Sequence, residues 1–375
     1  AFVLGMLSAL LAAGLWLQIA SYFGWPVSTT HSIVGAIIGF GVVYGGLSAI
    51  HWNKVGTIAA SWVVSPLMSG TISFLIFQIV LHRVFYRPDP VKAVRRFTPY
   101  MVFVVLGIMT LVMVFKGLKH LKLDLSFPNA LLVASGIGLI GAIISILLLR
   151  RYKTDDEIED GRQEQEQYAA RAMHKALKHL NRARRSAGSE DAKSSLDNVI
   201  KQTTELSITS TKRANLGSDN SKLRQVERIF IFLQILTACF VAFAHGANDV
   251  ANAIGPLSAA VQTAQDAVVA AKATVPMWAL ALGGIGIVIG LATYGWRVME
   301  TVGKKITELT PSRGFCAEFG AATTIVIASK LALPISTTHT LVGAVLGVGL
   351  ARGIGALNLS TVRDNFILLN EFLLI

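Results

Sequence analysis

The chain has 375 residues, of which 53% are hydrophobic and only 15% charged, and its formal net charge is +12. Apolar stretches of about 20 residues, each able to cross a bilayer core of ~30 Å, recur along it, which excludes a soluble enzyme. Half of the lysines and arginines lie in one polar insert, so basic loops retained on the cytoplasmic side explain the positive charge, and no nucleic-acid partner is expected.

The chain begins inside a hydrophobic run, which predicts a first helix over 1–20. Gly24 and Pro26 interrupt it, and Pro also lacks a backbone donor. A glycine-rich helix is expected over 31–50 and a further membrane span over 54–81. The opening in mid-run leads us to expect an N-terminally incomplete repeat.

A basic loop over 82–96 then marks the cytoplasmic side. Two spans follow, over 99–115 and 128–149, and they return the chain to that side. The next segment is charged at both signs and almost free of aromatic residues. Within it the spacing predicts a surface helix over 164–180, and the Ser, Thr and Asn content predicts a loosely ordered stretch over 186–220.

Membrane helix resumes after this insert and alternates with polar segments. The predicted spans are 229–244, 276–296, 314–333 and 340–351, with a polar turn at 262–272 and a cytoplasmic loop at 297–313. We therefore expect four parts. They are a first transport repeat at 1–82, a basic loop with two connecting helices at 83–150, a charged cytoplasmic insert at 151–228, and a second, C-terminally incomplete repeat at 229–375.

One six-residue motif occurs twice in this chain. Pro26–His31 reads PVSTTH and Pro334–His339 reads PISTTH, at an offset of 308 residues that further flanking matches share. The coincidences indicate an internal duplication that carries hydroxyl groups into hydrocarbon twice. A buried hydroxyl without a partner costs about 1–3 kcal/mol, so each cluster needs something to bind. The alternative, hydroxyls bonded back to their own helix carbonyls, suits a single Ser-Thr pair better than a duplicated motif.

A second polar motif lies within one apolar run. Asp249 costs about 2.5–3.5 kcal/mol at the centre of a membrane helix. Asn248 and Asn252 share a helical face beside it, and Gly246 and Gly255-Pro256 bracket the group. This pattern predicts a broken helix whose freed carbonyls and carboxylate hold a small cation, while a half-helix N-terminus faces an anion. An interhelical hydrogen-bond cluster is the alternative.

The charged residues in and near the two motifs narrow the class of substrate. Hydroxyls and helix N-termini suit an oxyanion, yet neither motif contains Lys or Arg, and Asp249 would repel an anion. Lys330 is the nearest cation, but its counterpart in the first copy is Tyr22, so it is not part of the duplicated design. The positive charge must therefore arrive as a co-bound cation or proton, which describes a symporter.

The GANDVAN stretch, Gly246–Asn252, together with the two Ser-Thr-Thr-His motifs, resembles the inorganic phosphate transporter (PiT) family, which is sodium/phosphate-symporter-like. The resemblance implies an all-α polytopic membrane protein with two inverted repeats and broken or re-entrant helices, which holds phosphate between the repeats and couples its transport to sodium or protons. It implies phosphate contacts from Ser28, Thr29, Thr30, Ser336, Thr337, Thr338, Asn248, Asp249 and Asn252. It implies cation coupling through Asn248, Asp249, Asn252 and Glu318, with Asp249 and Asn252 as sodium ligands.

Glu318 is also a candidate by itself, because a glutamate in an apolar run is functional by default. Two departures from the family pattern concern the ends. The family carries an Asn-Asp-x-x-Asn motif in each repeat, whereas this chain has one, and the spacing places the other before Ala1. The Ser61–Pro66 segment should also recur near 369–374, where the sequence differs.

We expect cation-coupled symport of inorganic phosphate by an integral protein of the lipid membrane, in bacteria the inner membrane. Sodium is favoured over a proton because the candidate ligands are hard oxygens. No cofactor is expected, and the glycine-rich faces suggest a homodimer. The alternatives are a permease for sulfate or another tetrahedral oxyanion, and an intramembrane serine hydrolase with Ser336, His339 and Asp249 as a triad. A triad needs asymmetric roles, whereas this chain duplicates Ser and His together. For His31 and His339 we expect a structural hydrogen bond.

Overall fold

The computed structural model describes residues 1–114, 126–151, 172–270, 273–306, 309–331 and 333–353. These residues form helices and connecting turns and contain no strand, which confirms the predicted all-α class. Within the described ranges, six helical segments are long and apolar enough to cross a membrane. They are Phe2–Phe23, Trp52–Phe85, Pro90–Val112, Phe127–Arg151, Lys222–Asp266 and Met277–Gly303.

The first duplicated motif lies at the turn of a helical hairpin. Helix α1 (Phe2–Phe23) ends at Gly24, whose φ of 72° is left-handed and whose N–H bonds back to α1 carbonyls. Helix α2 (Thr29–Gly45) starts after an extended Ser28 and packs against α1. With 17 residues α2 is only ~26 Å long. The motif therefore joins a helix long enough to cross a membrane to a shorter apolar helix.

After a short 3-10 turn (Leu47–Ala49), helix α3 (Trp52–Val80) continues into a π-helical turn at Leu81–Phe85. Helix α4 (Pro90–Val112) then begins nine residues before the predicted Pro99, which lies inside it. The Asp89 carboxylate caps this start by accepting the Lys92 N–H at 3.1 Å. Some of the basic residues that were predicted to lie in a loop therefore belong to the first turns of α4. Helix α5 (Phe127–Arg151) follows.

Helix α7 (Glu190–Asp266) is one continuous helix of 77 residues, which corrects three predictions. The stretch 190–220 is helical rather than loosely ordered, the helix does not break at the GANDVAN stretch, and it extends to residue 266 in the predicted polar turn. The glycines there keep right-handed backbone angles, and Pro256 removes one N–H from an otherwise intact ladder. Residues 172–186 form a further helix, and the part of the predicted surface helix before 172 lies outside the described residues.

The second half continues with α8 (Met277–Gly290) and a segment in which α9 (Trp296–Glu300) lies between two π-helical turns, Leu291–Gly295 and Thr301–Ile306. The predicted loop at 297–313 is thus helical as far as Ile306. Helices α10 (Pro311–Lys330) and α11 (Thr337–Ala351) then form a second hairpin around the second motif. The predicted recurrence at 369–374 lies outside the described residues.

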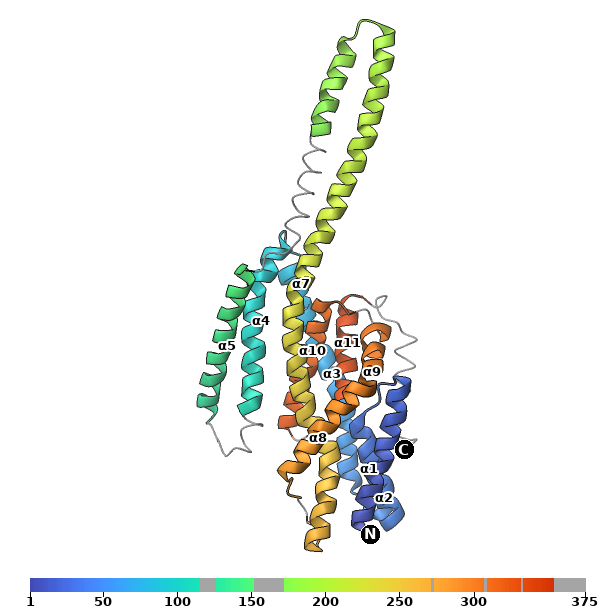
Figure 1. The fold of residues 1–375 in the computed structure, drawn as a ribbon, viewed down its shortest axis with the longest axis vertical. Helices are drawn as coiled ribbons and strands as arrows, with labels where there is room; N and C mark the ends of the chain where they lie inside the picture. The colour runs from blue at the N-terminus through green and yellow to red at the C-terminus, as the bar shows by residue number, and fades with distance from the viewer. Residues whose placement is uncertain (115–125, 152–171, 271–272, 307–308, 332, 354–375) are drawn as a thin grey trace. The chain divides into compact units, whose positions relative to one another are not determined.

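The chain divides into two compact units. One contains 1–82, 101–139 and the described part of 230–375, and the other contains 83–100 and 140–229. Both hairpins belong to the first unit, where α3 packs along α10 and α11 (Figure 1). In the second unit Arg184 forms an ion pair with Asp197 of α7. The predicted four-part division stays a prediction.

Candidate functional site

The two hairpins meet at their turns through a reciprocal pair of hydrogen bonds. We call Pro26–Thr30 the first tip and Pro334–Thr338 the second tip. The Thr30 hydroxyl donates to the carbonyl of residue 335 at 3.0 Å, and the Thr338 hydroxyl donates to the carbonyl of residue 27 at 3.1 Å. Because both pairs are related by the same offset of 308, the duplicated sequence produces a local two-fold arrangement.

The serines of the motif are helix caps. The Ser28 Oγ accepts the N–H of His31 at 3.2 Å, and the Ser336 Oγ accepts the N–H of His339 at 3.1 Å. Both serines are buried, so the hydroxyls satisfy N–H groups that a helix start otherwise leaves open. The caps place α2 and α11 with their N-termini at the tips.

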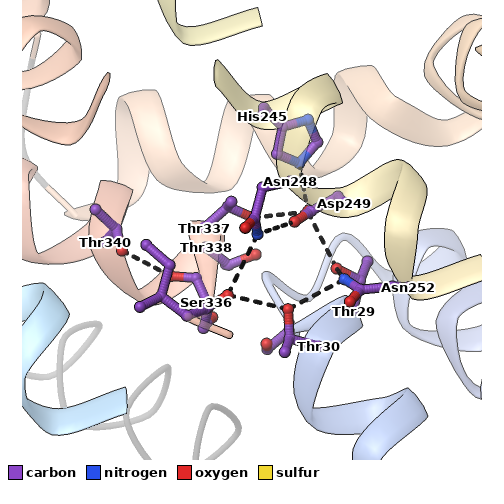
Figure 2. A network of polar contacts seen from close by, with 12 residues as sticks. Thr29, Thr30, His245, Asn248, Asp249, Asn252, Ser336, Thr337, Thr338 and Thr340 are labelled. Atoms are coloured by element: carbon purple, nitrogen blue, oxygen red, sulfur yellow. Dashed lines mark hydrogen bonds and ion pairs between the residues drawn. The ribbon is translucent and has the colours of Figure 1, made fainter. Parts of the chain in front are cut away.

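A single carboxylate on α7 joins both tips (Figure 2). The Asp249 Oδ2 accepts the Thr29 hydroxyl at 3.1 Å and the Thr337 hydroxyl at 2.8 Å. Its Oδ1 accepts the Asn248 amide at 2.8 Å, and the residue is 8% exposed. Equivalent threonines from the two repeats therefore donate to the same carboxylate oxygen, although the Asn-Asp-x-x-Asn motif that contains Asp249 occurs once in this sequence.

The two asparagines extend this network along the same face of α7. The Asn252 amide donates to the Thr29 and Thr30 hydroxyls at 3.3 and 3.1 Å. The Asn248 side chain lies at the second tip, 3.5 Å from both the Ile335 carbonyl and the Ser329 hydroxyl. Their spacing of four residues places both amides beside the tips because the helix is unbroken.

His245 is a residue of the site to which the sequence analysis gave no role. Its Nε2 lies 2.8 Å from the Asp249 Oδ2, one helical turn along α7. The i, i+4 spacing of His245 and Asp249 indicates this contact only in a continuous helix, whereas a broken helix was expected here. An imidazole is therefore the nearest titratable group to the carboxylate, where Lys and Arg are missing from both motifs.

The two histidines of the duplicated motif lie against each other behind the hydroxyls. The His31 and His339 ring centroids are 4.4 Å apart in an edge-to-face contact, and Trp62 of α3 lies 3.7 Å from the His31 ring. Both histidines are buried. Their positions near the local two-fold favour a packing role, and the predicted hydrogen bond stays a prediction.

Glu318 occupies a different place. Its Oε2 accepts the Thr237 hydroxyl at 2.7 Å, across α10 and α7. Thr237 precedes Asp249 by 12 residues, which is ~18 Å along a helix. The structure thus brings the predicted phosphate-contacting side chains together and separates Glu318 from them. Thr237 was missed because a lone Thr in an apolar run carries no signal.

The site offers oxygen ligands and hydroxyl donors. Its carboxylate, carboxamide and hydroxyl oxygens are hard ligands, which suit an alkali cation better than a soft transition metal. Among the described residues no group of three His, Cys, Asp or Glu could hold a metal ion. Asp249 pairs with His245 and the threonines, and Ser336 caps α11, so these side chains are engaged otherwise than in a hydrolytic triad.

Several known proteins are similar to this chain in sequence or in structure. Residues 1–368 match the model of the phosphate transporter family. The chain is 44% identical over 363 residues to a putative phosphate permease of Chlamydia pneumoniae, covering 97% of this chain and 74% of the relative. It is 42% identical to the chloroplastic inorganic phosphate transporter 2-1 of Arabidopsis thaliana, covering 96% of this chain and 54% of that one. A solved structure described as the sodium-dependent phosphate transporter superposes with a TM-score of 0.73 at 35% identity, over 98% of this chain and 76% of that one.

Proposed function

Because the chain belongs to the phosphate transporter family, we propose that it carries inorganic phosphate across the membrane by symport with a cation, sodium in preference to a proton. It is an integral membrane protein, and bacterial relatives such as those of Chlamydia pneumoniae and Haemophilus influenzae fit an inner-membrane location. The relatives named above are permeases and transporters, which is consistent with a chain that is not an enzyme.

The observation that carries the proposal is the Asp249 carboxylate held by a threonine from each tip. The Thr29 and Thr337 hydroxyls already converge on a carboxylate oxygen, which is an oxyanion. A tetrahedral phosphate between the tips would accept these donors together with those of Thr30 and Thr338, and Ser28 and Ser336 would keep the helix N-termini directed at it. Phosphate would then replace Asp249 as the acceptor of the Thr29 and Thr337 hydroxyls, and it would replace the carbonyls of the opposite tip as the acceptors of the Thr30 and Thr338 hydroxyls.

An Asp249 released in this way provides the cation site. Its carboxylate and the carboxamide oxygens of Asn248 and Asn252 would bind sodium beside the phosphate, so that each ion stabilises the other. The structural relative described as sodium-dependent supports this choice of cation. Glu318 of α10, which accepts the hydroxyl of Thr237 on α7, would be a second coupling position.

The test is phosphate uptake by the purified protein in proteoliposomes. Radiolabelled phosphate is measured under an inward sodium gradient at equal pH, and under a proton gradient without sodium. We expect accumulation with sodium and none above the leak with protons alone. Accumulation driven only by the proton gradient would show that the coupled cation is a proton and not sodium. No accumulation in either case would refute symport.

Two further arms address the remaining alternatives. Excess sulfate should leave phosphate uptake unchanged, whereas strong competition would indicate a general oxyanion permease. A covalent serine probe should not label Ser336, and Ser336→Ala should weaken uptake. Labelling of wild-type protein with uptake retained in Ser336→Ala would favour a hydrolase instead.

A further inference from the structure

Arg297 forms an aromatic-lined contact that the proposed transport mechanism does not use. Its guanidinium carbon lies 4.8 Å from the Tyr22 ring centroid, 5.6 Å from that of Tyr294 and 5.4 Å from that of Trp296. Its Nη1 also donates to the Tyr22 carbonyl at 2.5 Å. A half-buried cation is thus held by three rings and by the backbone of a segment 275 residues away.

This contact lies where α1 turns towards the first tip. Tyr22 is in the last turn of α1, and Gly24 is its left-handed cap. A Cβ on Gly24 would lie 3.2 Å from the Arg297 carbonyl oxygen and 3.4 Å from the Thr301 hydroxyl. Both the guanidinium and the backbone of α9 therefore contact the start of the turn that leads to Thr29 and Thr30.

The helix that carries Arg297 is itself irregular. Five-residue α9 lies between the π-helical turns Leu291–Gly295 and Thr301–Ile306. Such π insertions re-aim side chains and are frequent at functional sites. Here Tyr294 lies within one of these turns and Arg297 beside it, and both contact Tyr22 of α1.

The second tip has a different support. The residue equivalent to Tyr22 is Lys330, so the aromatic part of this contact is absent from the duplicated pattern. Instead Ser61 of α3 donates to the Pro334 carbonyl at 3.1 Å, and Ser69 donates to the Thr340 carbonyl at 2.6 Å. Each tip is therefore fixed by a different partner.

We propose that Arg297 is a positioning residue that fixes the turn of residues 24–28, and through it the phosphate-contacting Thr29 and Thr30. The proposal rests on the proposed function for its consequence in transport. It gives Arg297 no direct contact with phosphate, because the guanidinium is engaged by the Tyr22 carbonyl and the three rings. The loss of Arg297 therefore weakens substrate binding rather than the capacity of the occupied carrier to turn over.

The first measurement separates KM from the maximal rate in proteoliposomes. Arg297→Gln should raise the KM for phosphate about tenfold, because it removes a charged hydrogen bond and the cation–π contacts, with the maximal rate within about twofold. Arg297→Lys should recover part of the affinity, since it keeps the charge but not the planar fork. Tyr22→Phe is the matched control and should behave as wild type. An unchanged KM in Arg297→Gln, or a lowered maximal rate alone, would overturn the proposal.

The second measurement does not depend on transport. Hydrogen exchange of the protein in detergent micelles should be several-fold faster in Arg297→Gln at the Trp25 and Val27 amides, which bond to the Ala20 and Trp25 carbonyls. The Leu333 amide before the second tip, bonded to the Ala328 carbonyl, should be unaffected. An equal change in the exchange rates at both tips, or no change at either tip, contradicts the proposal. If wild-type protein fails to accumulate phosphate, the proposed function is refuted while this measurement still decides the role of Arg297.

Discussion

The two hairpins carry the same motif on differently packed supports. Each tip contains a capping serine, and its two threonines donate one to Asp249 and the other to the opposite tip. Yet 12 of the 20 residues of α10 are buried, against five of the 22 residues of α1. The hydrogen bonds that the two tips share are therefore made whether the helices behind them are deeply or sparsely packed.

The difference in packing arises from α3, which lies against the second hairpin. A Cβ on Gly347 of α11 would lie 2.1 Å from the Gly70 carbonyl oxygen of α3, so the two backbones touch. Gly39, the equivalent residue of α2, has no atom of the described residues within 4 Å of such a Cβ. Equivalent glycines thus serve close packing in one hairpin and meet open space in the other.

The largest effect is expected where the hairpins are alike, at the shared carboxylate. Asp249→Asn keeps an acceptor for both threonines but removes the charge that would hold the cation. We expect the sodium concentration for half-maximal phosphate uptake to rise about a hundredfold or more, because a pair of unit charges about 4 Å apart is worth about 4 kcal/mol at an effective dielectric constant of about 20. Asp266→Asn, at the exposed end of the same helix, is the control and should leave it unchanged. Unaltered sodium dependence in Asp249→Asn would remove Asp249 from the coupling site.

The next effect should separate the hairpins. Gly347→Ala forces a methyl group into the α3 backbone, and overpacking of this kind costs about 1–3 kcal/mol or more. Gly39→Ala should be neutral or should stabilise by about 0.5–1 kcal/mol, since alanine is the better helix former. Thermal unfolding in detergent measures both. Equal losses of stability would mean that α2 is packed as closely as α11.

A smaller effect tests the reciprocal bonds. Thr338→Val leaves the partly buried carbonyl of residue 27 without its donor, which costs about 1–2 kcal/mol and should raise the KM for phosphate roughly five- to thirtyfold. Thr30→Val should cost more, because the Thr30 hydroxyl also accepts the Asn252 amide. The double variant should be less than additive, since the two bonds close one interface. Additive losses would show that the tips act independently.

The smallest effect concerns the caps. Ser28→Ala and Ser336→Ala each remove the side-chain acceptor of a helix start, at about 1 kcal/mol, in spite of the different burial of the two hairpins. Replacement by glycine should cost only a few tenths of a kcal/mol. Unfolding midpoints of the four variants test this. A much larger loss for Ser336→Ala alone would mean that burial, and not capping, determines its role.

The sequence allowed the two turns to be predicted, because the duplication and the helix breakers Gly24 and Pro26 are local signals, and the family resemblance implied that the two repeats meet. The capping role of Ser28 and Ser336 was not predicted. The sequence led to wrong predictions where the continuity of a long helix overrides a local signal. Pro256 reads as a breaker, but one missing N–H is a small loss in a helix already formed on both sides. The Ser-, Thr- and Asn-rich stretch 190–220 reads as loose because these residues are poor helix formers, yet it extends an adjacent membrane helix and avoids a new nucleation step.

Other parts of the site have no signal in the sequence. Arg297 reads as one of several basic residues in a loop, and its partner Tyr22 is 275 residues away. Thr237 beside Glu318 likewise depends on how α7 and α10 pack. Contacts between distant elements of this kind follow from packing that no periodicity encodes.

The two capped helix starts have an electrostatic consequence. Each helix N-terminus carries about half an elementary positive charge, and those of α2 and α11 both face the Asp249 carboxylate. Together they offset roughly the single negative charge of that carboxylate, so with a neutral His245 the site is close to electroneutral before any ion enters. Every negative charge that a ligand adds must then be matched by a cation taken up with it, and the number of cations moved per cycle should follow the ionisation state of the anion.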